Sequence, residues 1–223
     1  MSEVRAALDP SRTWAIIPVR GLERAKSRLA GPLDAEERVD LVSRLLRRAM
    51  AAAGDSALVA GTIVVSGDPA VLDLASASGA IPVSDQERGL NPALELARAE
   101  ALARGATAIV VLPGDLPWLG RETLDGVLSV AGEAWARAGA APDRALVAVV
   151  PDRHGTGTNV LVLAPPTAID FAFGPGSRAE HAARARAAGA VHVELGGPLD
   201  VDLDTTEDLV LVEDLGPETI DVV

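Results

Sequence analysis

The chain has 223 residues, a net charge of −12, 48% hydrophobic and 23% charged residues, which is the balance of a folded globular protein rather than a disordered one. Aromatic residues make up only 2%, and the chain has no Cys. These values argue against an aromatic platform for single-stranded nucleic acid, and they exclude disulfides, thiolate catalysis and cysteine-bound zinc.

Most of the negative charge lies near the C-terminus. Residues 200–223 contain nine acidic residues and no basic one, whereas the other 199 residues carry 23 acidic and 20 basic residues. The lack of a strongly basic region argues against a nucleic-acid partner. Because no apolar run is long enough to cross a bilayer and the first 13 residues lack a signal-peptide stretch, we expect a cytoplasmic protein with no membrane partner.

Short apolar runs alternate with helical patterns along the whole chain. The first half predicts, in order, strand 13–19, helix 35–53, strand 62–65, helix 70–77, strand 81–83 and helix 91–104. The second half predicts strand 107–112, helix 121–137, strands 145–150 and 159–163, helix 177–188, strand 191–195 and helix 206–213. This alternation predicts one α/β domain over residues 1–223, with a mostly parallel sheet and helices on both faces.

Residues with special backbone roles suggest where some helices begin and end. Asp34 is suited to cap the first long helix, and Gly54 is expected to follow its end. Pro92 is suited to the first position of the helix that starts at Asn91. Since ligands of such sheets bind beyond the carboxyl ends of the strands, the loops after the strands are the places to search for chemistry.

The loop after the first strand contains one glycine, Gly21, and four basic residues, among them Arg20 and Lys26. Lys26 is the only lysine among 20 basic residues. Backbone amides at such a turn and nearby cations suit a phosphate chain, although a solvated basic turn is an equal alternative. A single glycine excludes both a Walker P-loop and a G-x-G-x-x-G dinucleotide loop.

Two acidic segments are candidates for a metal site. Asp115 follows the central strand and is flanked by glycine and prolines, so it is either a metal ligand or a turn residue. Asp200, Asp202 and Asp204 alternate along an expected strand, which would place three carboxylates on one face. Carboxylate-lined sites suit Mg²⁺, but Asp204 or Thr205 is also suited to cap the following helix.

Three glycine-containing segments precede regular elements. Residues 154–159 include Thr156, and residues 173–178 include Gly174 and Ser177 at a helix N-terminus, where free N–H groups make an anion site. For both, a tight connection without function is the alternative. Residues 89–91 place Asn91 where its amide is suited either to a base edge or to a helix cap.

Histidine catalysis is not indicated by the sequence. The three histidines, His154, His181 and His192, are scattered, and no Ser-His-Asp arrangement is recognisable. His192 lies inside a predicted strand and is expected to be structural.

These segments, in this order, resemble the guanylyltransferases of deazaflavin coenzyme (F-420) biosynthesis, which are relatives of the molybdenum-cofactor guanylyltransferases. The resemblance covers residues 17–209, and it is carried by IPVRGLERAKSRLAG, VVSGDP, ERGLNPALELA, VLPGDLPWL, RHGTGTNVLVLAP, FGPGSRAEHAARARAAGA and DLDTTEDL. It implies a three-layer α/β/α, Rossmann-like nucleotidyltransferase fold. It also implies transfer of GMP from GTP to phosphoenolpyruvate, 2-phospho-L-lactate or 3-phosphoglycerate, with release of pyrophosphate.

The resemblance also implies roles for individual residues. For the nucleotide they are Arg20, Gly21, Lys26, Gly89 and Asn91, with Lys26 and Asp115 as catalytic residues.

For two Mg²⁺ ions the implied ligands are Asp115, Asp202 and Asp204, and for the acceptor the implied residues are Thr156, Gly174 and Ser177. Arg20 stands where lysine is common in the family, and the third aspartate, Asp200, leaves open which two of the tail carboxylates bind metal.

Two other functions remain open at the level of sequence. One is another nucleotidyltransferase, such as a molybdopterin guanylyltransferase, although the paired glycine usual in that branch is missing from the first loop. The other is a nucleotide-binding domain that has lost its chemistry. The sequence is compatible with a homo-oligomer and fixes neither the oligomeric state nor the strength of a guanine preference.

Overall fold

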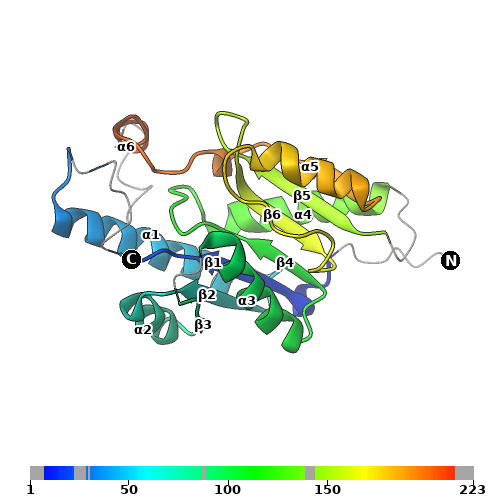
Figure 1. The fold of residues 1–223 in the computed structure, drawn as a ribbon, viewed down its shortest axis with the longest axis horizontal. Coiled ribbons are helices and arrows are strands. Elements are labelled where there is room, and N and C mark those ends of the chain that lie inside the picture. The colour runs from blue at the N-terminus through cyan, green and yellow to red at the C-terminus, as the bar shows by residue number, and fades with distance from the viewer. Residues whose placement is uncertain (1–7, 23–28, 30, 87–88, 139–143, 214–223) are drawn as a thin grey trace.

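Seven strands form one sheet in the order β3-β2-β1-β4-β6-β5-β7 (Figure 1). The computed structural model describes residues 8–22, 29, 31–86, 89–138 and 144–213. The strands are β1 (Thr13–Pro18), β2 (Gly61–Ser66), β3 (Ile81–Ser84), β4 (Ala108–Val111), β5 (Leu146–Pro151), β6 (Thr158–Ala164) and β7 (Val191–Glu194). β6 runs antiparallel to β4 and β5, and the other pairs are parallel, so the predicted mostly parallel sheet is confirmed.

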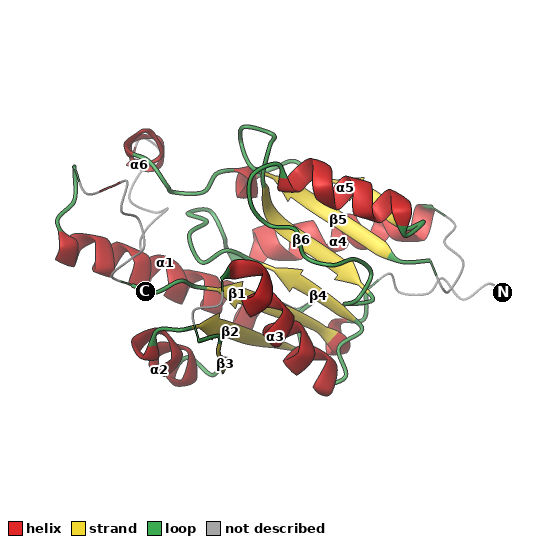
Figure 2. Cartoon of the chain, in the orientation of Figure 1, coloured by secondary structure: helices red, strands yellow, loops and turns green. Residues whose placement is uncertain are grey.

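Helices cover both faces of this sheet, as predicted (Figure 2). They are α1 (Ala35–Asp55), α2 (Pro69–Ala77), α3 (Leu90–Ala103), α4 (Arg121–Arg137), α5 (Ser177–Ala187) and α6 (Thr206–Glu213). Two details of the prediction are wrong. Helix α1 includes Gly54, and α3 begins at Leu90, so that Pro92 occupies its third position rather than its first.

The two faces of the sheet bury separate hydrophobic clusters. Successive side chains of a strand point to opposite faces, and in β1 Ile17 packs with Leu46 of α1 while Ile16 packs with Leu94 of α3. Helices α1, α2 and α4 cover the first face, and α3 and α5 cover the second. The near-continuous apolar runs in the sequence of the central strands follow from this burial on both sides.

The order of the strands reverses at β1, which pairs with β2 on one side and with β4 on the other. The loops after β1 and β4 therefore leave neighbouring strands at the same edge of the sheet, at a topological switch point. Since β6 is reversed, the turn between β5 and β6 lies at this edge too. The sheet thus gathers several predicted binding loops at one edge.

The acidic segment near the C-terminus differs from its prediction. Asp200 lies in a 3-10 helix (Pro198–Asp200), and residues 201–204 form no strand. Burial still alternates along them, because Val201 and Leu203 are buried while Asp202 and Asp204 are half-buried. The prediction of a strand that carries all three carboxylates on one face is therefore wrong.

The sequence predicts no segment that crosses a membrane, and the helices of the structure can be compared with this prediction. Among the residues that the structure describes, no helix combines the length and the apolar content needed to cross a bilayer.

Candidate active site

The first predicted loop is held in place by an aspartate from the neighbouring strand's loop. The N–H of Leu22 donates to Oδ2 of Asp68 at 3.0 Å. The other oxygen of Asp68 accepts the N–H of Ala70 and so caps α2. Gly21 has φ +132°, a backbone conformation that favours glycine, and an added Cβ would lie 3.3 Å from Oδ2 of Asp68. The turn therefore depends on both Gly21 and Asp68.

Of the two basic residues predicted to bind the nucleotide, the structure describes one. Arg20 is exposed at the start of this loop. Lys26 lies outside the described residues, so its place at the phosphates stays a prediction.

The second predicted loop carries Asp115 out of the centre of the sheet. Leu112 extends the pairing of β4 with β1, since its N–H donates to the carbonyl oxygen of Ile16 at 2.9 Å. An added Cβ at Gly114 would lie 3.6 Å from the side chain of Val19, which places this loop against the first one. Leu116 is buried and anchors the chain beyond Asp115. Asp115, half-buried, is thereby held close to the switch point.

The acidic C-terminal segment lies directly beside Asp115. The N–H of Leu203 donates to the carbonyl oxygen of Asp115 at 3.2 Å. Leu203 is the residue between Asp202 and Asp204, so the three predicted metal-binding aspartates come from two segments in contact. Within the described ranges, no three His, Asp or Glu side chains form a ready-made metal cluster. The donors are nevertheless carboxylate oxygens, which are the ligands that Mg²⁺ prefers.

Asp208, which sequence reasoning missed, organises this segment. Its Oδ2 accepts the N–H groups of Asp204 at 2.9 Å and Thr205 at 2.7 Å, and its own N–H donates to the Thr205 hydroxyl at 3.3 Å. This reciprocal arrangement makes Thr205 the cap of α6, one of the two alternatives left open by the sequence. The T-T-E-D spacing is the signal that would have predicted it.

Asp208 also joins the segment to the turn between β5 and β6. Its Oδ1 forms an ion pair of 2.5 Å with Arg153, and the Asp208 side chain is only 3% exposed. Burial by itself would raise the pKa of Asp208, but hydrogen bonds from Thr205 and Asp204 and the charge of Arg153 lower it below its usual value. The carboxylate is therefore ionised near neutral pH and acts as a fixed anchor.

The turn between β5 and β6 places Thr156 beside the start of α5. The N–H of Thr156 donates to Oδ1 of Asp152 at 2.8 Å, and the Thr156 carbonyl accepts the N–H of Arg178 at 3.3 Å. Arg178 also donates to the Gly155 carbonyl at 2.9 Å. An added Cβ at Gly157 would lie 2.6 Å from Oδ2 of Asp152, so glycine is required there for close approach. Thr156 and Ser177, both predicted at the acceptor site, are thus on adjoining segments.

The predicted acceptor loop, residues 174–177, forms a glycine-rich entry to α5. Gly174 and Gly176 have φ of +135° and +74°, and Gly176 is the N-cap residue of the helix. The N–H of Ser177 donates to the Gly174 carbonyl at 3.1 Å, and Ser177 is 2% exposed. The helix N-terminus, with its positive dipole end, lies at the same edge of the sheet as Asp115.

The loop before α3 overturns one of the two alternatives proposed for Asn91, the helix cap. The N-cap residue is Gly89, with φ +95°, so Asn91 is not the cap. The Asn91 amide instead pairs with the backbone of Phe173: Nδ2 donates to the carbonyl at 3.0 Å, and Oδ1 accepts the N–H at 2.9 Å. The predicted contact of Asn91 with a nucleotide base is not tested by this arrangement and stays a prediction.

Comparison with known proteins identifies the family. The model of the family described as "Guanylyl transferase CofC like" matches residues 13–216. The chain belongs to this family. Two relatives named phosphoenolpyruvate guanylyltransferase are similar over most of their length. The one from Sphaerobacter thermophilus is 42% identical over 88% of this chain and 90% of its own, and the one from Rubrobacter xylanophilus is 39% identical over 91% and 94%.

Solved structures show that the CofC fold is shared with other nucleotidyltransferases. The 4-diphosphocytidyl-2C-methyl-D-erythritol synthase of Anaerococcus prevotii has a TM-score of 0.60 at 8% identity, covering 96% of this chain and 99% of its own. A cytidylyltransferase from Leptospira borgpetersenii has a TM-score of 0.54 at 13% identity, covering 95% and 98%. The nucleotidyltransferase fold expected from the sequence is confirmed.

Proposed function

We propose that the chain is a Mg²⁺-dependent guanylyltransferase that transfers GMP from GTP to phosphoenolpyruvate in coenzyme F-420 biosynthesis. The observation that carries this proposal is the contact of Leu203 with Asp115, which joins the carboxylate-bearing segments at the switch point of a CofC-family chain. The names of the relatives favour phosphoenolpyruvate over 2-phospho-L-lactate and 3-phosphoglycerate as acceptor.

The reaction joins an oxygen of the acceptor's phosphate to the α-phosphorus of GTP. The bond from this phosphorus to the oxygen that bridges to the β-phosphate breaks, and its electron pair leaves with pyrophosphate. A phosphate monoester is already largely dianionic at neutral pH, because its second pKa is about 6, so no general base is required. His181 agrees with this, since it is buried and its ring is used in structural hydrogen bonds.

The chain's own task is to position two anionic substrates and to hold the ions that neutralise them. Asp115, Asp202 and Asp204 would hold Mg²⁺. When bound, Mg²⁺ supplies positive charge to the triphosphate and to the group being transferred. Lys26 would contact the leaving pyrophosphate.

The two substrates would enter on different loops of this edge. Arg20, Gly21 and Gly89 lie in the loops proposed for the nucleotide. Thr156 and the loop of residues 174–177 lie on the adjoining segments proposed for the acceptor. N–H groups at the start of α5 would meet the acceptor's carboxylate or phosphate.

Truncation of Ser177 is expected to weaken acceptor binding selectively. Ser177→Ala should raise the KM for phosphoenolpyruvate roughly tenfold, which is the loss of one hydrogen bond to a charged group. The Kd of GTP should stay within about twofold, because the nucleotide is assigned to other loops. Steady-state kinetics and equilibrium dialysis measure the two quantities.

The matched control is Ser76→Ala on α2, whose hydroxyl is exposed and donates to the Leu72 carbonyl. A selective loss of GTP affinity in Ser177→Ala would place the acceptor elsewhere.

Replacement of the only lysine by arginine is expected to slow turnover. Lys26→Arg keeps the charge but exchanges a compact ammonium for a wide planar fork beside a triphosphate and metal ions. We expect kcat to fall at least about tenfold, which is about 1.4 kcal/mol of transition-state stabilisation. The melting temperature should barely change, because a lysine whose role is to bind the substrate contributes little to the stability of the fold.

Stopped-time assays with Lys26→Arg and the control Arg137→Lys, at the exposed end of α4, measure this effect. Unchanged kinetics in Lys26→Arg would mean that the single lysine is an accident of composition.

The proposed activity is tested by pyrophosphate release from GTP with each three-carbon acceptor in turn. We expect rapid release with phosphoenolpyruvate and Mg²⁺, slower release when ATP or CTP replaces GTP, and none in the presence of excess EDTA. No release with any acceptor would favour a nucleotide-binding domain without chemistry.

A further inference from the structure

The chain crosses the sheet between the end of β6 and the start of α5. Because β6 is antiparallel to its neighbours, it ends at the edge opposite the site, and the chain must return before α5 begins there. Residues 169–173, here named the crossing segment, form part of this return and belong to no helix or strand. Ile169 and Phe171 are 6% and 5% exposed and anchor it to the second hydrophobic cluster.

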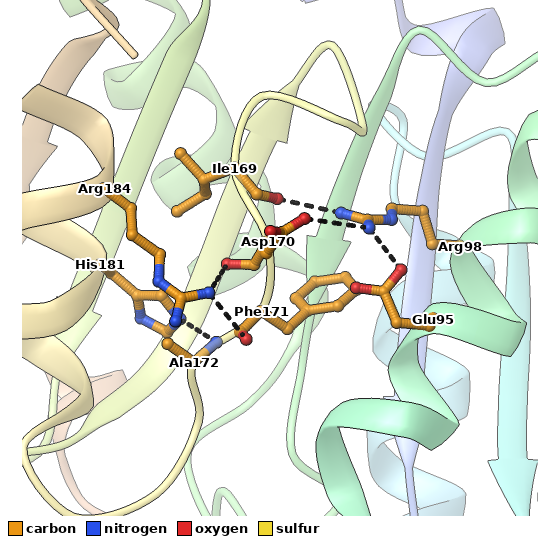
Figure 3. Close-up of polar contacts among 8 residues, drawn as sticks. All are labelled: Glu95, Arg98, Ile169, Asp170, Phe171, Ala172, His181 and Arg184. Atoms are coloured by element: carbon orange, nitrogen blue, oxygen red, sulfur yellow. Dashed lines mark hydrogen bonds and ion pairs between the residues drawn. The ribbon is translucent and has the colours of Figure 1, made fainter. Parts of the chain in front are cut away.

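A buried segment without regular structure needs partners for its backbone polar groups. Side chains from the two flanking helices provide them (Figure 3). Arg98 of α3 donates to the Ile169 carbonyl at 2.9 Å, and its guanidinium lies 4.8 Å from the centre of the Phe171 ring. Arg184 of α5 donates to the carbonyls of Asp170 and Phe171 at 3.1 and 3.2 Å.

The last two residues of the crossing segment are held by His181 and Asn91. The N–H of Ala172 donates to Nε2 of His181 at 3.1 Å (Figure 3). Asn91 then pairs with both backbone groups of Phe173, the residue directly before the acceptor loop. Asn91 and Phe173 are 82 positions apart in the sequence, so this pairing is a long-range cross-link.

The place of Asn91 makes this cross-link different from the others. Arg98, Arg184 and His181 bind the crossing segment from within the helices. Asn91 is the second residue of α3, two positions after Gly89, and Phe173 is adjacent to Gly174. Its amide therefore connects the loop assigned to the nucleotide with the loop assigned to the acceptor. An amide side chain offers both the donor and the acceptor that this pairing uses.

We propose that Asn91 is a positioning residue that sets the acceptor loop, residues 174–177, relative to the nucleotide loop through its two hydrogen bonds to Phe173. This inference rests on the proposed function for the identity of the two loops. Since in-line transfer requires the two substrates to be correctly aligned, a loosened acceptor loop lowers the rate with little effect on GTP binding.

The kinetic test uses Asn91→Asp and Asn91→Ala. Asn91→Asp keeps the shape but loses the donor to the Phe173 carbonyl, so it serves if Asn91→Ala fails to fold. We expect kcat/KM for phosphoenolpyruvate to fall at least about tenfold in both, with the Kd of GTP within about twofold. The contact of Asn91 with the nucleotide base, which was predicted from the sequence, would instead raise the Kd of GTP. Such a loss of GTP affinity, or unchanged kinetics, would overturn the proposal.

A double-mutant cycle with Ser177→Ala asks whether Asn91 acts through the acceptor loop. The proposal predicts that the two substitutions are not additive, because the second removes a contact that the first has already loosened. Fully additive effects would contradict it. The control is Trp135→Phe, which removes a side-chain hydrogen bond of 2.9 Å to the Arg144 carbonyl at the other end of the sheet.

Hydrogen exchange gives a second measurement that does not depend on activity. In Asn91→Ala, amides of residues 171–178 should exchange at least about tenfold faster than in the wild type, while Trp135→Phe leaves them unchanged. Unchanged exchange in Asn91→Ala would refute the positioning role even in an active enzyme. Failure of the proposed function would show itself separately, as a wild-type protein that transfers no GMP to any acceptor.

Discussion

Asp115→Asn is expected to retain the fold and to lower kcat by at least about a thousandfold, or about 4 kcal/mol of transition-state stabilisation. The substitution preserves the size of the side chain and the carbonyl that accepts the N–H of Leu203. It removes the negative charge that would hold Mg²⁺ between the central strand and the acidic segment. The folded state should be preserved because Leu116 and the pairing of Leu112 with Ile16 anchor this loop.

Initial rates at saturating GTP and phosphoenolpyruvate, together with a thermal melt, measure this prediction. Asp73→Asn is the matched control, because Asp73 is exposed on α2, a helix that contains none of the predicted site residues. Near-normal turnover of Asp115→Asn would show that Asp115 is a turn residue.

The second large effect concerns the pH dependence of stability. The pKa of His181 is lowered from 6.5 to about 4, chiefly by burial. The charges of Arg184 and His192 act in the same direction, and the charge of Glu180 acts against them. The neutral ring is required by its contacts, since Nε2 accepts the N–H of Ala172 and the other ring nitrogen lies 3.0 Å from the Thr158 hydroxyl. Protonation would remove the acceptor at Nε2.

The direction of the effect follows from proton binding in the two states. Above pH 6.5 both states carry a neutral His181, and the contribution to stability is complete. Between pH 6.5 and about 4 only the unfolded chain binds the proton, so the free energy of unfolding falls as the pH falls. The loss over this range is on the order of 3 kcal/mol.

Urea unfolding of the wild type and of His181→Gln at a series of pH values measures this contribution. The variant should be less stable at neutral pH, and the difference between the two proteins should shrink as the pH falls from 6.5 to 4. Ser76→Ala, which removes an exposed hydroxyl and no titratable group, is the control and should show a constant difference. A constant difference for His181→Gln as well would contradict the assignment of a neutral buried ring.

Local patterns were sufficient to predict the fold. The apolar runs predict the seven strands, and the helical periodicity predicts the six α-helices, that the structure describes, because these signals lie within a few neighbouring residues. The failure at residues 200–204 has a physical reason. An alternating pattern indicates alternating burial, which the structure has, but strand pairing depends on a neighbouring edge that the local sequence does not reveal.

The candidate site was predictable where it depends on strand ends and not where it depends on long-range contacts. Asp115 follows a recognisable central strand, and the structure places it beside Leu203. Asp68 holds the N–H of Leu22, which is 46 positions away in the sequence. His181 holds the N–H of Ala172, which lies in a segment without regular structure. Nothing in the sequence around Asp68 or His181 indicates these roles. Asn91 is recognisable as unusual, but its partner Phe173 is not.

The central claim is that GMP becomes joined to the phosphate of the acceptor, and mass spectrometry of the product tests it most directly. Incubation with GTP, phosphoenolpyruvate and Mg²⁺ should give a single new species with the mass of phosphoenolpyruvate plus GMP less one water. It should form in equal amount to pyrophosphate. Release of pyrophosphate with free GMP, or of phosphate with GDP, and no joined product would contradict the account, because the site would then hydrolyse GTP rather than transfer its nucleotide.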